Sequence, residues 1–61
     1  MITIKVFTDS SPFAPVIFEN VDFYHETRKT LEIIQEESYK TTITTFFKEH
    51  LINYSIIENR A

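Results

Sequence analysis

Hydrophobic and polar residues alternate along much of the chain, with the period of two that is typical of a half-buried β-strand. The clearest run covers residues 2–8, where Ile2, Ile4 and Val6 share one face. Residues 9–15 contain two prolines within a polar cluster. Because proline cannot donate a hydrogen bond to a strand ladder, this segment predicts a loop.

The middle of the chain has the pattern of a hairpin. Residues 16–26 predict a second strand that bends near 19–20, and residues 30–36 predict a third. A three-residue loop at 27–29 keeps the apolar side chains of both strands on one face, whereas an even-length loop would mix the faces. We therefore expect an odd loop length. The pairs in this register are His25/Leu31, Phe23/Ile33, Tyr24/Glu32 and Glu26/Thr30.

The second half of the chain continues in the same style. A turn is expected at 37–39, followed by a threonine-rich strand over residues 40–47. A second turn at 48–50 leads into a last strand that ends at Glu58. Residues 59–61 are expected to form a frayed tail.

The side-chain types favour strands over helices. Ile, Val and Thr account for 20 of the 61 residues, and Leu and Ala together account for four. Branching at Cβ restricts χ1 and suits a pleated surface. We expect a single small all-β domain over residues 1–61, a five-stranded antiparallel meander that is curled or barrel-like.

A helical alternative exists for part of the chain. Tyr39, Ile43, Phe47 and Leu51 follow one another at intervals of four, which places them on one face of a helix. Four threonines between residues 41 and 45 oppose this interpretation, because threonine is a poor helix former. The alternative fold is α+β, with a helix within residues 40–52.

Three segments carry a resemblance to a known group of proteins. They are residues 18–24 (FENVDFY), 31–34 (LEII) and 47–58 (FKEHLINYSIIE). Together they resemble small uncharacterised proteins of Gram-positive bacteria and of their phages and plasmids. Those proteins are similar to short antiparallel meanders that can close into SH3-like barrels. The resemblance implies such a barrel and a mobile-element origin, and it implies no catalytic residue.

Composition narrows the function classes. The chain has no glycine, which excludes P-loops and dinucleotide-binding fingerprints, and no cysteine, which excludes disulfides and thiolate metal sites. Nine acidic against six basic residues give a net charge of −3. A large basic face for non-specific nucleic-acid binding is therefore not expected. A small barrel whose aromatic residues stack on single-stranded bases stays an alternative.

The apolar stretches are too short for a membrane segment. The longest purely apolar run covers residues 16–18, and the N-terminus lacks a basic region before an apolar run. We expect no membrane span and no signal peptide. A reducing compartment, the cytoplasm, is the default location for a chain without cysteine.

The polar residues form no strong catalytic or metal-binding pattern. His25 and His50 each neighbour a glutamate, but adjacent residues of a strand point to opposite faces and would not chelate together. A chain of 61 residues also leaves little volume for a substrate cleft. We expect no metal, no cofactor and no enzymatic activity. An enzyme whose site forms at a subunit interface is a second alternative.

Several strands carry apolar residues on both faces, which predicts self-association. Phe7 lies on the face opposite Ile4, and Ile34 on the face opposite Ile33. A one-sided sheet would leave a patch of several hundred Å² in water. We expect a homodimer or a larger assembly, formed by the second face or by unpaired edges of the first and last strands.

The acidic hairpin and the exposed aromatic residues are the expected contact surface for another protein. Residues 19–37 carry six acidic and two basic side chains, a local balance of −4. Such a surface attracts basic partners. The sequence thus favours a non-enzymatic protein-interaction module, such as an accessory or inhibitor protein. The expected partner-binding residues are Phe13, Asp22, Tyr24, Glu26, Glu32 and Tyr39.

Overall fold

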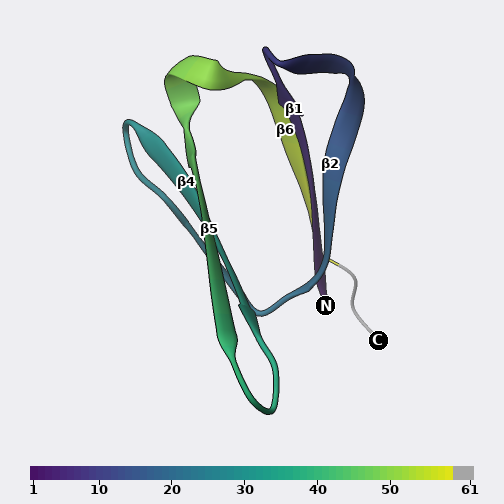
Figure 1. Cartoon of the computed structure of the whole chain (residues 1–61), viewed down its shortest axis with the longest axis vertical. Coiled ribbons are helices and arrows are strands. Elements are labelled where there is room, and N and C mark those ends of the chain that lie inside the picture. Colours follow the sequence, from purple (N-terminus) through teal and green to yellow (C-terminus); the bar gives the residue numbers. More distant parts are fainter. Residues whose placement is uncertain (59–61) are drawn as a thin grey trace.

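A computed structural model describes residues 1–58 as six strands in two antiparallel sheets (Figure 1). The strands are β1 (Ile2–Thr8), β2 (Ser11–Val21), β3 (Phe23–Glu26), β4 (Thr30–Glu36), β5 (Thr41–Phe47) and β6 (Leu51–Glu58). A 3-10 helix, η1 (Lys48–His50), joins β5 to β6. The first sheet has the order β2-β1-β6 and the second the order β3-β4-β5. The all-β prediction is confirmed. The predicted tail, residues 59–61, lies outside the described residues.

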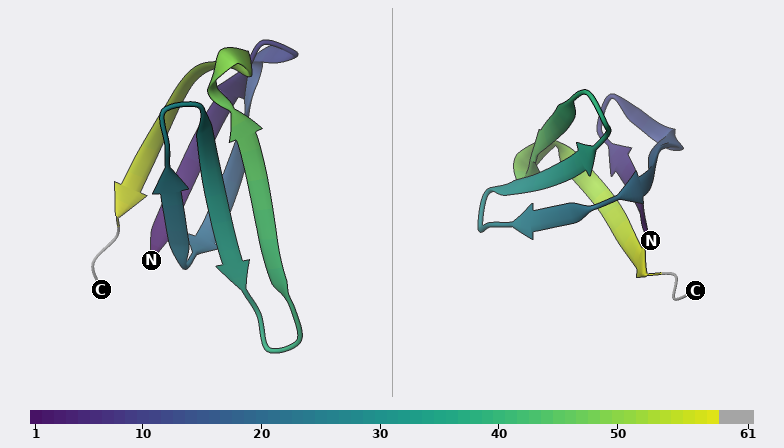
Figure 2. Two further views of the ribbon diagram at one scale, coloured as in Figure 1. Left: turned by 90° about the vertical axis from the view of Figure 1, so that its left-hand side faces the viewer. Right: turned by 90° about the horizontal axis from the view of Figure 1, so that it is seen from below.

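The core lies between the two sheets, which face each other (Figure 2). Ile4 and Val6 of β1 and Leu31 and Ile33 of β4 are fully buried, and Val21 at the end of β2 joins them. Partly buried side chains pack around this group: Ile2, Phe18, Phe46, Leu51, Tyr54 and Ile56. Both sheets therefore depend on one shared core.

The two sheets are held together by side chains. Within residues 1–58, no strand ladder joins one sheet to the other, so the chain does not form the closed barrel that the resemblance implies. The predicted five strands are roughly matched by the six that the structure contains. The rings of Phe18 on β2 and Phe46 on β5 meet edge to face, with centroids 5.7 Å apart. This geometry is a favourable arrangement for aromatic pairs.

The first strand is central in its sheet, which corrects its prediction as an unpaired edge. β1 pairs with β2 on one side and with β6 on the other, and Ile4 lies opposite both Phe18 and Ile56. This central position agrees with the burial of Ile4 and Val6, because a strand on each side keeps water away from their side chains. The last strand, β6, is an edge as predicted.

The second strand begins earlier than the proline pattern predicts. β2 starts at Ser11 and includes Pro12 and Pro15, so the predicted loop over 9–15 is wrong for its second part. The strand tolerates both prolines because β2 is an edge and because the ladder is irregular there. Thr8 pairs with Ser11 while Val6 pairs with Val16, which leaves the prolines in a wide bulge.

The predicted bend near residues 19–20 is present as a β-bulge. The register shifts by one between the pairs Ile4–Phe18 and Ile2–Val21, and Asn20 has a positive φ of 56°. Asparagine is among the few residues that adopt this conformation at modest cost, which matters in a chain without glycine. Two residues after Asn20, Asp22 separates β2 from β3, so the predicted strand over 16–26 is divided between the two sheets.

The hairpin between β3 and β4 has a two-residue loop, and the predicted odd loop length is wrong. The Thr27 N–H donates to the Thr30 carbonyl at 2.9 Å, which leaves Arg28 and Lys29 as the loop. The Thr27 hydroxyl accepts the Thr30 N–H at 2.9 Å and lies 2.6 Å from the Thr30 hydroxyl. These side-chain bonds stabilise a tight turn without glycine.

The shorter loop shifts the register by one residue from the prediction. Phe23 pairs with Ile34, Tyr24 with Ile33, His25 with Glu32, and Glu26 with Leu31. Opposed residues of an antiparallel pair point to the same side of the sheet. Tyr24 and Glu26 therefore lie on the core side of β3, whereas Phe23 and His25 lie on the outside.

The threonine-rich segment is a strand, so the helical alternative within 40–52 is wrong. β5 pairs with β4 over seven consecutive positions, from Thr41–Glu36 to Phe47–Thr30. The branched side chains of four threonines favour this extended conformation. The predicted turn at 48–50 is the 3-10 helix η1.

Candidate interaction surface

The outer face of the second sheet carries a row of apolar side chains. The register of β3, β4 and β5 places Phe23, Ile34 and Ile43 side by side across the three strands. Leu31 and Ile33 face the core, so this row faces away from it. Phe23 is 59% exposed and Ile43 62% exposed. We call these three residues the outer row.

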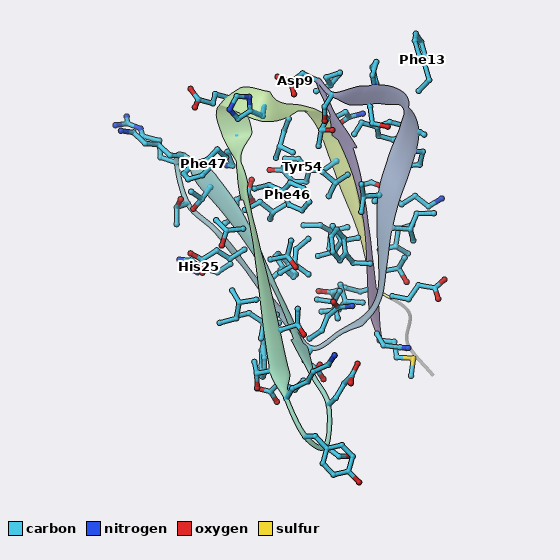
Figure 3. All side chains as sticks on the ribbon, in the orientation of Figure 1. Asp9, Phe13, His25, Phe46, Phe47 and Tyr54 are labelled. Atoms are coloured by element: carbon cyan, nitrogen blue, oxygen red, sulfur yellow. The ribbon has the colours of Figure 1, made fainter. Side chains whose placement is uncertain are left out.

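Polar and aromatic side chains flank the outer row. The next row across the same face consists of His25, Glu32 and Thr45. Phe47 lies beyond it, opposite Thr30, and its side chain is exposed. Figure 3 shows His25 and Phe47 on the outside of the second sheet, while Phe46 and Tyr54 point into the space between the sheets. The face combines apolar contacts with the negative charge of Glu32.

Phe13 and Tyr39 are the two most exposed aromatic residues, and they lie at opposite ends of the molecule. Phe13 is 97% exposed at the start of β2, where Figure 3 shows it pointing away from the core. Tyr39 is 99% exposed in the turn between β4 and β5. Figure 1 shows this turn at the bottom of the molecule and the start of β2 at the top. They cannot share one contact surface, although each can contact a partner separately.

Asp22, another predicted contact residue, has a structural role. Its carboxylate accepts the backbone N–H of Glu36 at 2.7 Å, and its own N–H donates to the carbonyl of Ile34 at 3.0 Å. Both bonds continue the β3–β4 pairing past the end of β3. Nearby, the Gln35 side chain donates to the carbonyl of Glu19 at the bulge, at 2.9 Å.

The remaining predicted residues divide between the two sides of the second sheet. Tyr24 and Glu26 lie on the core side of β3, and Glu32 lies on the outer face next to the outer row. The acidic hairpin therefore does not present its charges on a single face. Among the six predicted residues, Glu32 is the one that lies beside the outer row.

Glu26 connects the two sheets through Tyr54 and Lys48. The Tyr54 hydroxyl donates to Glu26 Oε1, and Lys48 Nζ lies 2.9 Å from the same oxygen. These two contacts, with the tyrosine contribution first, lower the pKa of Glu26. The hydrogen bond to Glu26 raises the pKa of Tyr54, and the contact with Glu26 also raises the pKa of Lys48. The cluster joins β3, β6 and η1 at one end of the core.

The two histidines do not belong to a common site. His50 Nδ1 lies 3.1 Å from Asp9 Oδ2, and its Nε2 lies 3.6 Å from Glu49 Oε1. His25 lies on the outer face of β3 instead. Within residues 1–58, no group of three histidine or acidic side chains is placed to hold a metal ion.

A shallow cavity lies beside Phe47. It has a volume of about 420 Å³ and is lined by Arg28, Lys29, Phe47, Lys48 and Glu49. A second cavity, of about 360 Å³, is lined by residues around the Asn20 bulge. Neither lining contains a serine or histidine nucleophile beside a base, so neither cavity has the geometry of a nucleophilic site.

Sequence reasoning missed Phe23 as a surface residue because of the loop length at 27–29. An odd loop assigns Phe23 to the core, and the two-residue loop moves it to the outside. The available signal was the pair of threonines at 27 and 30, whose hydroxyls stabilise a two-residue turn. The sequence correctly placed Ile34 on the face of β4 that points away from Ile33.

Within residues 1–58, no helix is long and apolar enough to cross a membrane.

Comparison with known proteins does not assign the chain to a family. No protein-family model matches the chain, and neither the curated proteins nor the solved structures contain a significant match.

Proposed function

We propose that this chain is a small non-enzymatic protein-interaction module that binds another protein through the outer face of its second sheet. The outer row carries this proposal. Three apolar side chains from three strands lie side by side, and two of them are more than half exposed. A contiguous apolar patch of this kind on a small protein is typical of an interaction site.

The charges near the outer row define the chemistry of the partner. Glu32 lies on the same face as the outer row, and the whole chain carries a net charge of −3. Aromatic residues such as Phe23 contribute strongly to binding when they enter an apolar pocket. We therefore propose a partner that presents an apolar pocket bordered by basic side chains.

The resemblance to SH3-like meanders supports a further part of the proposal. All four pairs of neighbouring strands are antiparallel, and the last strand returns to pair with the first. Together with the likeness to small proteins of Gram-positive bacteria and their mobile elements, this order supports a cytoplasmic accessory or inhibitor protein.

The experiment compares capture of partners by the wild-type chain and by two variants from the cells that make it. Phe23→Ser removes the exposed aromatic ring of the outer row. Ile17→Ser is the matched control, because Ile17 is a similarly exposed apolar residue that lies opposite Lys5 in the first sheet. A captured protein is then purified, and its affinity for all three chains is measured by calorimetry.

We expect Phe23→Ser to weaken binding by at least about tenfold and Ile17→Ser to leave the affinity unchanged. Circular dichroism establishes that each variant is folded. Equal affinities of the wild type and Phe23→Ser for the purified partner would contradict the proposal.

The cavity beside Phe47 supports nucleic-acid binding as a second candidate. Three cationic residues and one aromatic ring line it, a combination that can contact phosphate and stack on a base. Lys48 is already paired with Glu26, which reduces the charge offered to a phosphate. Fluorescence anisotropy with single-stranded oligonucleotides tests this candidate, since such binding must fall steeply with added salt.

A further inference from the structure

The outer edge of β5 is long, regular and uncharged. β5 pairs with β4 on one side, and the described strands place nothing on its other side. Its seven pairs with β4 include no register shift, and its sequence, TTITTFF, contains no charge and no proline. An edge with these properties is a template for the addition of another strand.

The other sheet edges are protected in ways that β5 is not. β2 contains Pro12 and Pro15 and two irregularities in its ladder. β3 has four residues. On β6, the Asn53 side chain accepts the backbone N–H of Tyr54 at 2.9 Å, which occupies one donor of that edge. The contrast singles out the β5 edge.

The hydrogen-bond pattern identifies the backbone groups that β5 offers. The Glu37 N–H donates to the Lys40 carbonyl and the Lys48 N–H to the Lys29 carbonyl, both at 2.8 Å, at the two ends of the β4–β5 ladder. Bonded pairs alternate along an antiparallel ladder, so the even-numbered residues of β5 bond toward β4. The odd-numbered residues, among them Ile43, therefore direct their N–H and C=O groups to the outer edge.

The sequence of this edge is self-complementary. Residues 41–45 read TTITT, which is the same in both directions about Ile43. An antiparallel copy centred there places Ile43 opposite Ile43 and each Thr41 opposite a Thr45. Pairs of β-branched residues and pairs of threonines are favourable across strands.

We propose that a second copy of this chain adds to the β5 edge by antiparallel pairing, with Ile43 of each copy at the two-fold axis. Three of the odd-numbered residues, Thr41, Ile43 and Thr45, supply the inter-chain hydrogen bonds. The two second sheets become one continuous sheet of six strands. Pairing of five residues buries less than the roughly 800 Å² per partner of a standard interface, so we expect a weak dimer whose population rises with concentration.

The outer row gives this arrangement a second source of stability. Ile43 is the end of the row on the β5 side, since the row runs from Phe23 through Ile34 to Ile43. Pairing of two β5 strands at Ile43 joins the two outer rows end to end. The 62% exposed side chain of Ile43 then contacts its copy, which removes apolar surface from water.

Sedimentation velocity over a rising concentration series, combined with charge-swap variants, tests the proposal. The wild type changes from 7.3 kDa to twice that mass as the concentration rises. Ile43→Lys and Ile43→Glu each place two like charges opposite one another at the two-fold axis, so each weakens the dimer more than about tenfold. An equimolar mixture of the two variants restores a dimer, because the opposed charges are then of opposite sign.

Two further variants serve as controls. Ile17→Lys adds the same charge at an exposed position of the first sheet and leaves the dimer intact. Thr45→Pro removes an outward N–H and keeps the bonds to β4, so we expect it to weaken the dimer. This variant replaces the charged variants in the test if those do not fold. Phe23→Ser still dimerises, which separates this proposal from the proposed partner site.

Three results would overturn the proposal. The first is a wild-type chain that stays monomeric up to millimolar concentration. The second is a dimer that survives Ile43→Lys, because its interface would then lie elsewhere. The third is a mixture of the two charged variants that fails to associate, because the strands would then not pair at Ile43. A peptide that binds β5 while the chain itself stays monomeric would also overturn the proposal.

Discussion

The β2 edge of the first sheet and the β5 edge of the second differ in how readily another strand can pair with them. Both are outer strands whose backbone groups face away from their own sheet. β2 contains two prolines and two irregularities in its ladder, which prevent regular pairing with another strand. β5 has seven regular pairs with β4 and no charged residue or proline.

The outer faces of the two sheets differ in the same sense. In the first sheet, one row across the outer face consists of Ile17, Lys5 and Ser55. Lys5 thus separates Ile17 from β6. In the second sheet, Phe23, Ile34 and Ile43 form an uninterrupted row. On the basis of this difference we propose that the first sheet mainly supports the fold and that the second sheet carries the contact surfaces for other molecules.

The largest expected effect tests whether the two sheets are one cooperative unit. Ile4 of the first sheet and Ile33 of the second are both 0% exposed. We expect Ile4→Ala and Ile33→Ala each to lower the free energy of unfolding by about 3 kcal/mol, because each leaves a cavity in the shared core. Urea denaturation followed by circular dichroism measures this loss. An effect confined to one of the two variants would separate the sheets energetically.

The next effect distinguishes the two sides of β5. Thr44 bonds toward β4, so Thr44→Pro removes a ladder hydrogen bond and lowers the stability by about 1–3 kcal/mol. Thr45→Pro, one residue further, affects an outward N–H and leaves the chain folded. Thermal melting of both variants checks the assignment. Equal losses of stability would show that the alternation along β5 is misassigned.

A smaller effect concerns the bulge at Asn20, near the end of β2. Asn20 has a φ of 56°, which residues with a Cβ adopt at a cost. We expect Asn20→Ala to lower the stability by about 1 kcal/mol and Asn20→Gly to retain it. Denaturant titrations of the two variants make the measurement. A more stable alanine variant would argue against the left-handed conformation.

The smallest effect is a pH dependence of the link between the sheets. The contacts with Tyr54 and Lys48 lower the pKa of Glu26 from 4.5, so their stabilising effect is present above that value and is lost as the pH falls through the lowered pKa. The raised pKa of Tyr54 gives the opposite sign, with a loss as the pH rises beyond 10.0. We expect Tyr54→Phe to weaken both dependences in melting curves recorded across pH. Unchanged acid and alkaline limbs in that variant would contradict the link.

The sequence predicts the strands better than it predicts their pairing. The alternation in residues 2–8, the bend near Asn20 and the turn at 48–50 are each encoded locally and are confirmed. The register of the hairpin is not local in this sense, because one residue more or less in the loop at 27–29 moves every side chain of β3 to the other face. Phe23 consequently appears as a core residue in the sequence and as a surface residue in the structure.

The prolines and the edge positions show a second limit of sequence reasoning. Pro12 and Pro15 forbid a central strand but are compatible with a bulged edge, and the sequence does not reveal which of these applies. The apolar residues on both faces of the strands correctly indicated that some apolar side chains lie outside the core. Their assignment to the outer row required the register of three strands.

Amide hydrogen exchange at residue resolution, measured at low and high protein concentration, shows directly whether a second copy pairs with the β5 edge. The amides of Thr42 and Thr44 bond toward β4 and are expected to be protected at both concentrations. The amides of Thr41, Ile43 and Thr45 face the outer edge, and we expect their protection to rise with concentration as a second copy pairs with β5. Fast exchange of these three amides at every concentration would contradict this pairing.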